Sequence, residues 1–486
     1  MSQEGYLTKS IVLCLFFHSF CLSSAFNGVT LFSNSIGLGP SKTYLINNNY
    51  NTINIWSHSS GLVGTPYLLR DRTLLIQLRS DFHFFGNSHG PIGGLFQKVN
   101  WDGEVIWSFD YSDFFYHPHH DFQPLSNGNI LIICWEKKTA QEAQSVGRIN
   151  VMNEMWPLKI VEIEPIDLDS GIVVWEWHLW DHLIQDVDSS LPNFGDISEH
   201  PELIDINLGN FTNPNEGDWL HTNAIDYNPT LDQIVFSSRH LDEIYIIDHS
   251  TSVEEAASHF GGHSNMGGDV LYRWGNPQNY DRGSEENKML NDQHGVNWIE
   301  EDLSGAGNLL IFNNNPTDTS GQNNSLGNSS VVEIIPPLNN EYNYDISDSA
   351  FGPSEYFWVY GGDETFFSHF QSGAYRIPNN NTIITVTQEK YIFEIDDSGQ
   401  VVWEYFPEMD SGIGGYTARA KKYSINYFED VLGDVNTDYI LDIFDIMILN
   451  EMIVNNETQS NDGDINQDGI VNNDDLLMLI SFIMGL

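Results

Sequence analysis

The chain has few cysteines and few basic residues for its length. Three of its 486 residues are cysteine, and 19 lysines and arginines stand against 68 acidic residues, for a formal net charge of −49. A field of that sign repels nucleic acid and anionic membrane surfaces, so the composition argues against both as partners. An acidic surface instead favours solubility in a salty or calcium-rich medium.

Several catalytic motifs are absent as well. The sequence contains no HExxH, no CxxC and no P-loop. These absences argue against a zinc protease and a nucleotide-dependent transferase. Helical periodicity is also scarce, being limited to 139–147, 251–259 and the C-terminal tail.

The longest uninterrupted apolar run lies near the N-terminus. A basic residue precedes IVLCLFFHSFCLSSAF (11–26), in which a short apolar core is followed by small residues. This pattern predicts a secretory signal peptide over residues 1–25 and a secreted or cell-surface protein with no membrane span in its mature chain. Removal of Cys14 and Cys21 would leave Cys134 alone, so we expect no internal disulfide.

Two acidic repeats lie within residues 431–486. GDVNTDYILDIFD (433–445) and GDINQDGIVNNDD (463–475) place oxygen-bearing groups in the register of a calcium loop, and each leads into an apolar helical stretch. Gly469 occupies the sharp-turn position of the second loop, where the first has Tyr439. The predicted Ca²⁺ ligands are Asp434, Asn436, Asp438, the Ile440 carbonyl, Asp442, Asp445, Asp464, Asn466, Asp468, the Ile470 carbonyl, Asn472 and Asp475. The pair resembles a dockerin domain, which implies a small α-helical calcium-binding domain and a protein partner.

One strand pattern recurs six times between the two ends. A strand with an aromatic pair contains, in turn, Trp56, Trp107, Trp175, Trp274, Trp358 and Trp403. Further short strand patterns precede several of the copies, and this combination is typical of a β-propeller. The sequence therefore predicts an all-β, six-bladed β-propeller over 26–428, in which 43–57 and 417–428 share the blade that closes the ring.

Two long polar insertions interrupt the repeat. They occupy 178–219 and 250–268 and are rich in turn residues. Insertions on a rigid repeat scaffold either build the mouth of a functional site or pack at the periphery, and the sequence does not distinguish these outcomes.

Histidines recur at the start of the repeated segments. His120, His221, His294 and His369 each precede a turn and an apolar run, and Arg239 lies at the far end of the run that His221 opens. Because the first strand of each blade lines the channel of a propeller, we expect these side chains to converge near one end. One such histidine is ordinarily only a hydrogen-bonded polar residue, but the recurrence favours a shared site. Three histidines could also bind zinc, although Arg239 suits an anionic substrate better.

Four runs of the sequence are long and distinctive: HHDFQPLSNGNILI, WLHTNAIDYNPTLDQIVFSSRHLDEIYIIDHS, LYRWGNPQNY and QHGVNWIEED. They resemble the bacterial arylsulfate sulfotransferase family, and the similarity covers about 65–415. The resemblance implies a six-bladed propeller that moves a sulfuryl group from a phenolic sulfate ester to a phenol acceptor, without a nucleotide donor or any cofactor for the transfer. Some periplasmic members rely on a disulfide, which Cys134 alone cannot form.

Carried onto this chain, the resemblance makes His294 the nucleophile, with His120, His221 and Arg239 around the sulfuryl group. A neutral imidazole can attack sulfur and carry the group as a sulfohistidine, which divides the transfer into two displacements. The guanidinium can stabilise the charge on the sulfuryl oxygens. A further histidine can protonate the leaving phenolate and later deprotonate the acceptor, and the sequence leaves His221 and His120 open for that role.

Weaker candidates and alternatives remain. His119 is the alternative to His120 for the first histidine position of the site. We prefer His120 because it directly precedes Asp121 and the strand. His369 is a weak candidate for substrate binding. Trp219, Trp274 and Trp298 either stack on an aryl substrate or fill blade cores. The alternative functions are a non-catalytic binding propeller attached through its dockerin-like tail and an aryl sulfate hydrolase that uses water as acceptor.

Overall fold

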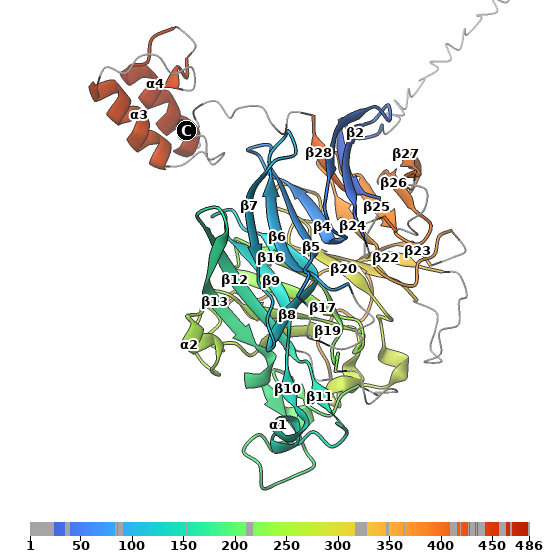
Figure 1. Cartoon of the computed structure of the whole chain (residues 1–486). Coiled ribbons are helices and arrows are strands. Elements are labelled where there is room, and N and C mark those ends of the chain that lie inside the picture. The colour runs from blue at the N-terminus through green and yellow to red at the C-terminus, as the bar shows by residue number, and fades with distance from the viewer. Residues whose placement is uncertain are drawn as a thin grey trace, which may run out of the picture.

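The molecule is built from six four-stranded antiparallel sheets around one channel (Figure 1). The computed structural model describes residues 24–34, 39–82, 85, 91–151, 153–209, 217–315, 328–346, 349–362, 365–408, 416–417, 419–425, 427, 433, 435, 443–455, 463–466 and 469–484. The prediction of an all-β, six-bladed propeller is confirmed. We number the blades 1 to 6 from the sheet that contains the N-terminal strand.

Each blade contributes one strand to each of four concentric positions. The inner strands are β28 (Lys421–Ser424), β4 (Leu62–Leu68), β8 (Tyr116–Pro124), β16 (Thr222–Asn228), β20 (His294–Trp298) and β24 (Gly373–Arg376). The second strands are β1 (Gly28–Ser33), β5 (Leu74–Arg79), β9 (Ile130–Glu136), β17 (Gln233–Ser238), β21 (Leu309–Asn313) and β25 (Thr382–Val386). The third strands are β2 (Lys42–Asn47), β6 (Gly94–Val99), β12 (Leu158–Ile166), β18 (Glu243–Asp248), β22 (Ser330–Ile334) and β26 (Tyr391–Ile395). The outer strands are β3 (Thr52–Ser57), β7 (Val105–Asp110), β13 (Ser170–His178), β19 (Val270–Trp274), β23 (Trp358–Gly361) and β27 (Val401–Tyr405).

Blade 1 closes the ring with strands from both ends of the propeller. β28 pairs antiparallel with β1, and Lys421 lies opposite Leu31 in the register. The expectation that 43–57 and 417–428 share a blade is therefore confirmed. Closure of this kind pairs the two terminal strands, which would otherwise be exposed sheet edges.

The six recurring tryptophans all lie on outer strands, which explains their spacing in the sequence. Five of the indole N–H groups donate a hydrogen bond to the following blade: Trp56 to the Asn100 carbonyl, Trp107 to Ser170, Trp175 to the Thr251 hydroxyl, Trp274 to Pro353 and Trp403 to Asn48. Trp358 instead packs under the Arg376 guanidinium, 5.3 Å from the ring centroid. The repeated aromatic is thus a contact between neighbouring blades.

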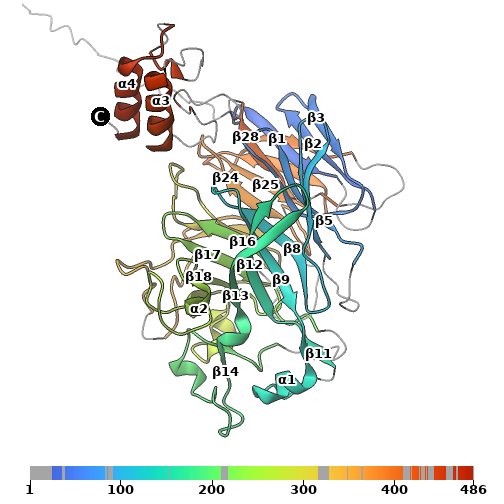
Figure 2. The same cartoon turned by 60° about the vertical axis from the view of Figure 1, so that its left-hand side comes forward.

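The connections between the blade strands, including the two insertions, carry the remaining short elements. These are β10 (Lys138–Thr139), α1 (Ala140–Ser145), β11 (Glu154–Met155), β14 (Leu183–Ile184), β15 (Ile204–Asp205) and α2 (Val253–Ala256), with the 3₁₀ turns Leu179–Asp181, Ile197–Glu199, Pro277–Tyr280 and Glu285–Asn287. The helical patterns at 139–147 and 251–259 thus contain α1 and α2. Segment 250–268 packs on β13 at the rim of the propeller, away from the channel (Figure 2).

Two helices follow the propeller and form a core of their own. α3 (Ile443–Asn455) and α4 (Asn473–Met484) lie apart from the sheets in Figure 1. Leu449, Ile465, Val471 and Leu479 are buried between them. Across the described part of the chain, no helix combines the length and the apolar character that a membrane crossing requires.

Candidate active site

The inner strands are bulged where the histidines lie. The pairing register shifts after Pro118 in β8, after Thr222 in β16 and after His294 in β20. His120 and His221 both have a φ of 51°, in the left-handed region that side chains other than glycine rarely adopt. A bulge re-aims the side chains beside it, and such strain is concentrated at functional sites.

At the bulge of β20, the residue with a positive φ is Gly295, and it is a glycine because two blades meet there. Gly295 has a φ of 63°, and a Cβ built on it would lie 2.8 Å from the Ser372 carbonyl oxygen. This close approach of blades 5 and 6 fixes the backbone directly after His294. The side chain of His294 is consequently held at the channel with only 3 % of its surface exposed.

His294 has a defined tautomer. Its Nδ1 lies 2.9 Å from both the Asp292 carbonyl oxygen and the Asn314 Oδ1. The Asn314 amide nitrogen donates to the Ser368 carbonyl oxygen, so the Oδ1 is the atom that faces the histidine. Because both neighbours of Nδ1 are acceptors, Nδ1 carries the proton and the lone pair lies on Nε2.

A hydrogen-bonded chain of side chains lies beside it. The Asp218 carboxylate accepts from His221 Nδ1 at 2.6 Å, and His221 Nε2 lies 3.2 Å from His120 Nε2. His120 Nδ1 lies in turn 2.7 Å from His119 Nδ1. His119 stacks on Trp135, with the ring centroids 4.2 Å apart, which restricts its position. The structure thus brings His119, His120 and His221 into one proton-sharing network.

The electrostatics keep three of the channel histidines neutral. Burial lowers the pKa of His120 and of His294 well below the usual value, and the Arg239 guanidinium lowers the pKa of His294 further. Burial likewise lowers the pKa of His119 to about 3. Although burial raises the pKa of Asp218, His221 outweighs that effect and the pKa is held below its usual range, so its carboxylate is ionised. Neutral imidazoles beside a fixed cation suit an anionic ligand.

Arg239 returns to the histidines through a hairpin. The run that His221 opens is two strands, β16 and β17, so Arg239 lies next to His221 and its backbone N–H donates to the His221 carbonyl oxygen at 3.3 Å. One guanidinium nitrogen pairs with Asp292 at 2.9 Å. Among the described residues, the buried Arg239 Nε and the Thr222 hydroxyl have no hydrogen-bond partner. Buried polar groups without partners are rare, and this group could bind the oxygens of an anion.

Other candidates lie elsewhere. His369 packs on Phe367, with ring centroids 4.4 Å apart, and no hydrogen bond joins it to the channel histidines in the part of the chain described. Trp219 and Trp274 are buried in blade cores. Trp298 lines a cavity at the opposite end of the inner strands.

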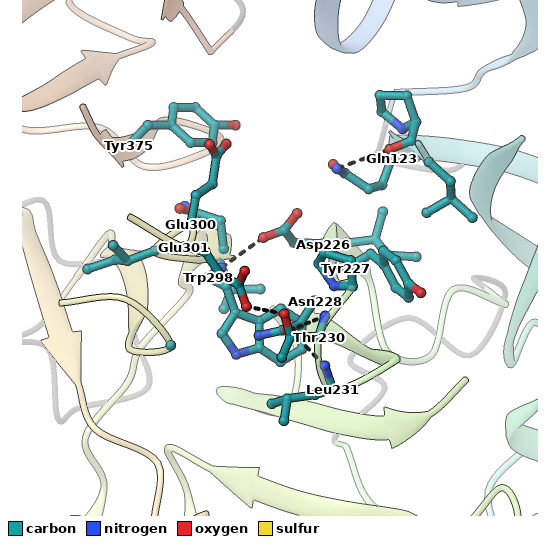
Figure 3. Close-up of a pocket in the computed structure, with 18 of the residues that line it drawn as sticks. Gln123, Asp226, Tyr227, Asn228, Thr230, Leu231, Trp298, Glu300, Glu301 and Tyr375 are labelled. Atoms are coloured by element: carbon teal, nitrogen blue, oxygen red, sulfur yellow. Dashed lines mark hydrogen bonds between the residues drawn. The ribbon is translucent and has the colours of Figure 1, made fainter. Parts of the chain in front are cut away.

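That cavity, of about 550 Å³, differs from the histidine end because acidic side chains line it (Figure 3). Asp226, Trp298 and Glu300 approach it from neighbouring strands, and burial raises the pKa of Asp226 to about 7 although Lys421 opposes the shift. The buried ion pair of Asp121 and Arg419, 2.7 Å apart, lines its inner end. Acidic walls disfavour a sulfate ester, so the histidine end is the better anion site.

Sequence reasoning missed three residues that orient the histidines. Asp218 lies only three residues before His221, and this short separation could have indicated the Asp–His pair from the sequence. Asn314 and Asp292 are less accessible from the sequence, because the antiparallel pairing of β20 with β21 brings Asn314 to His294.

The second acidic repeat has the geometry of an oxygen-rich loop. Gly469 adopts a φ of 86° at the predicted sharp turn, and Asp475 is fully buried, accepting hydrogen bonds from the backbone N–H groups of Asn466 and Asn472 at 3.0 and 2.8 Å. In the first repeat, Asp445 accepts from the Val435 N–H at 2.9 Å. Asp464 and Ile470 are also described, whereas the predicted ligands Asp434, Asn436, Asp438, Ile440, Asp442 and Asp468 lie outside the described residues, as do 1–23 of the predicted signal peptide.

Solved structures similar to this chain are distant. A protein of unknown function from Bacteroides caccae aligns with 81 % of this chain and 98 % of its own at 11 % identity, with a TM-score of 0.43. The β-propeller domain of Cps50 (Swd1) from Myceliophteria thermophila aligns with 79 % of this chain and 90 % of its own at 9 % identity and a TM-score of 0.37. Virginiamycin B lyase from Staphylococcus aureus aligns with 78 % and 90 % at 11 % identity and a TM-score of 0.34. These scores are too low to carry an argument about function.

The sequence comparison is more specific. No curated protein matches the chain. The sequence model of the family named Arylsulfotransferase (ASST) matches residues 70–390, which is more than half of the chain and includes the whole histidine cluster. The chain therefore belongs to the arylsulfotransferase (ASST) family.

Proposed function

We propose that this protein is an extracytoplasmic arylsulfate sulfotransferase that carries the sulfuryl group on His294. Family membership supports aryl sulfotransfer in general. The observation that carries the finer proposal is the tautomer of His294: its Nδ1 proton faces two acceptors, so the lone pair of its Nε2 is available to attack sulfur. Arg239 is close enough to lower the pKa of this ring, and its Nε has no hydrogen-bond partner among the described residues.

The first displacement forms a bond from His294 Nε2 to sulfur and breaks the bond from sulfur to the phenolic oxygen. The imidazole then becomes a cation, and the Asp292 carbonyl and the Asn314 amide oxygen stabilise its Nδ1–H. Arg239 donates to the sulfuryl oxygens. The phenolate leaves with a proton from the hydrogen-bonded pair of His221 and His120, and either ring suits this role.

The second displacement reverses these roles. The acceptor phenol gives its proton to the same histidine pair, its oxygen attacks sulfur, and the N–S bond breaks to return neutral His294. No nucleotide takes part, in keeping with the absence of a P-loop, and no metal or cofactor is needed for the transfer. Asp218 keeps its negative charge throughout and orients His221.

The release of 4-nitrophenol from 4-nitrophenyl sulfate tests this function, with no nucleotide present. We expect release to accelerate when a second phenol is added, and the His294→Asn variant to release none. Equal release with and without the second phenol would instead identify a hydrolase. Absence of release from folded protein with any phenol acceptor would favour a binding propeller.

We also propose that the C-terminal helices bind Ca²⁺ and dock to a protein partner. The ordered carboxylate of Asp475 and the turn at Gly469 suit a calcium loop. Ile443, Phe444, Met447 and Leu477 are exposed on the helices, where an apolar partner could cover them. The predicted signal peptide supports secretion, with display on the cell surface through the partner.

A further inference from the structure

A second histidine cluster lies at the rim between blades 3 and 4, outside the channel. His182 follows the 3₁₀ turn after β13, His259 follows α2, and Asp269 precedes β19. Asp269 Oδ1 lies 2.7 Å from His182 Nδ1 and 2.8 Å from His259 Nδ1. These three donor atoms all lie within 4.8 Å of one another. His182 and His259 come from the two long insertions of the sequence and Asp269 directly follows the second; the channel chemistry gives none of them a role.

The His182 ring is fixed in one orientation. It is fully buried, and its Nε2 donates to the Ala256 carbonyl oxygen at 2.9 Å. Trp177 stacks on the ring with an interplanar angle of 5°. A Cβ at Gly268 would lie 2.6 Å from Nε2, so only glycine leaves room for the ring. A histidine that binds a metal commonly donates its other ring N–H to a backbone carbonyl, and His182 has that arrangement with Nδ1 pointing at Asp269.

The arrangement of acceptors in the cluster favours a cation. Both nitrogens of His182 face oxygen atoms, Nδ1 the Asp269 carboxylate and Nε2 the Ala256 carbonyl. His259 offers a second proton to the same carboxylate oxygen. A divalent ion can replace the proton on each Nδ1 while His182 keeps its bond to Ala256. Asp269 Oδ2 makes no hydrogen bond to the described residues and offers a further oxygen.

We propose that His182 Nδ1, His259 Nδ1 and Asp269 bind a divalent transition-metal ion of the Zn²⁺ class, with water as the fourth ligand. Two imidazoles and one carboxylate suit Zn²⁺ or Co²⁺, whereas Ca²⁺ prefers an all-oxygen shell. Bonds of about 2.0 Å place tetrahedral donors roughly 3.3 Å apart, so the donors must separate slightly. The side chain of His259 is 62 % exposed and can move outward. The ion would clamp the insertion after β13 to the loop between β18 and β19.

Co²⁺ and Zn²⁺ titration of the full chain in calcium buffer tests the site. We expect one equivalent of Co²⁺ to give visible absorption bands of tetrahedral coordination, and Zn²⁺ to displace it and to raise the midpoint of thermal unfolding. His259→Gln removes a ligand from an exposed position and should abolish both effects. His263→Gln changes another exposed histidine of the same loop and should leave both intact.

The channel histidines are the competing site, and His294→Asn separates the two. Retention of the Co²⁺ bands in His294→Asn, with loss in His259→Gln, supports the rim site. Retention of the Co²⁺ bands in His259→Gln, or no Co²⁺ binding by the unaltered protein, overturns the proposal of a rim site. Asp269→Asn provides a second check, because it keeps the shape of the side chain and should weaken binding by removing the charge.

Discussion

At the residue scale, the proposed chemistry depends on which ring nitrogen carries each proton. Asn314 and the Asp292 carbonyl hold the proton of His294 on Nδ1, and Asp218 does the same for His221. His221 Nε2 then faces His120, and the lone pair of His294 lies on its Nε2. The depressed pKa of His294 keeps this nitrogen unprotonated at neutral pH, because burial and the guanidinium both disfavour the imidazolium.

Asp218→Asn should therefore slow the reaction without unfolding the protein. An asparagine can present its amide N–H₂ to His221 Nδ1, which would move the ring proton of His221 to Nε2. It would also leave no negative charge beside His221 when that ring becomes an imidazolium. We expect 4-nitrophenol release to fall by roughly 10²- to 10⁴-fold, the usual contribution of acid–base catalysis. Asp196→Asn, at an exposed 3₁₀ turn in the insertion, is the matched control and should keep normal activity. An unimpaired Asp218→Asn variant would exclude His221 as the acid–base group.

At the scale of the elements, neighbouring blades are joined by polar contacts as well as by tryptophan. His249 follows β18 in blade 4 and bridges Asp232 of its own blade and Glu162 on β12 of blade 3, at 2.7 and 3.0 Å. Burial lowers the pKa of His249, but the two carboxylates outweigh burial and raise it to about 9. The bridge is thus charged at neutral pH.

His249→Gln should lower the free energy of unfolding in a pH-dependent way. The pKa is higher in the folded chain than the usual 6.5, so the stabilisation is fully present below pH 6.5 and is lost as the pH rises through 9. The shift corresponds to roughly 3 kcal/mol at most. Urea unfolding of both proteins at pH 6, 8 and 10 measures the difference, which should be largest at pH 6. A difference that grows toward pH 10 would contradict the charged bridge.

At the scale of the whole molecule, the propeller and the C-terminal helices have separate cores. The propeller closes through β28 and β1, upstream of the helices. Calcium is therefore expected to stabilise α3 and α4 without affecting the channel.

Removal of calcium with a chelator should unfold the C-terminal helices and leave sulfuryl transfer unchanged. Far-UV circular dichroism should show loss of helix, and the 4-nitrophenol assay should show the same rate before and after. Asp475→Ala should reproduce the loss of helix in the presence of calcium. A parallel loss of activity would show that the tail supports the active site.

The sequence predicted the features that repeat and missed those that depend on long-range pairing. Tryptophan recurs because each outer strand contacts the next blade, so six copies indicated six blades. His221 and His294 were recognised because they lie at the start of inner strands, whereas His120, expected at a strand start, lies in the middle of β8 beside its bulge. Asn314 was missed because antiparallel pairing brings it to His294, and the relation of Arg239 to His221 was misjudged because a hairpin turn was read as one continuous run. The rim cluster involves segments that no repeat connects.

The most direct test of the central claim is the identification of sulfohistidine. The protein is mixed with excess 4-nitrophenyl sulfate without acceptor, digested at alkaline pH because the N–S bond is acid-labile, and analysed by peptide mass spectrometry. We predict one added SO₃ group on His294, which disappears when a phenol is supplied. An unmodified His294 in protein that transfers sulfate to phenol, or the SO₃ group on another residue, would contradict the account.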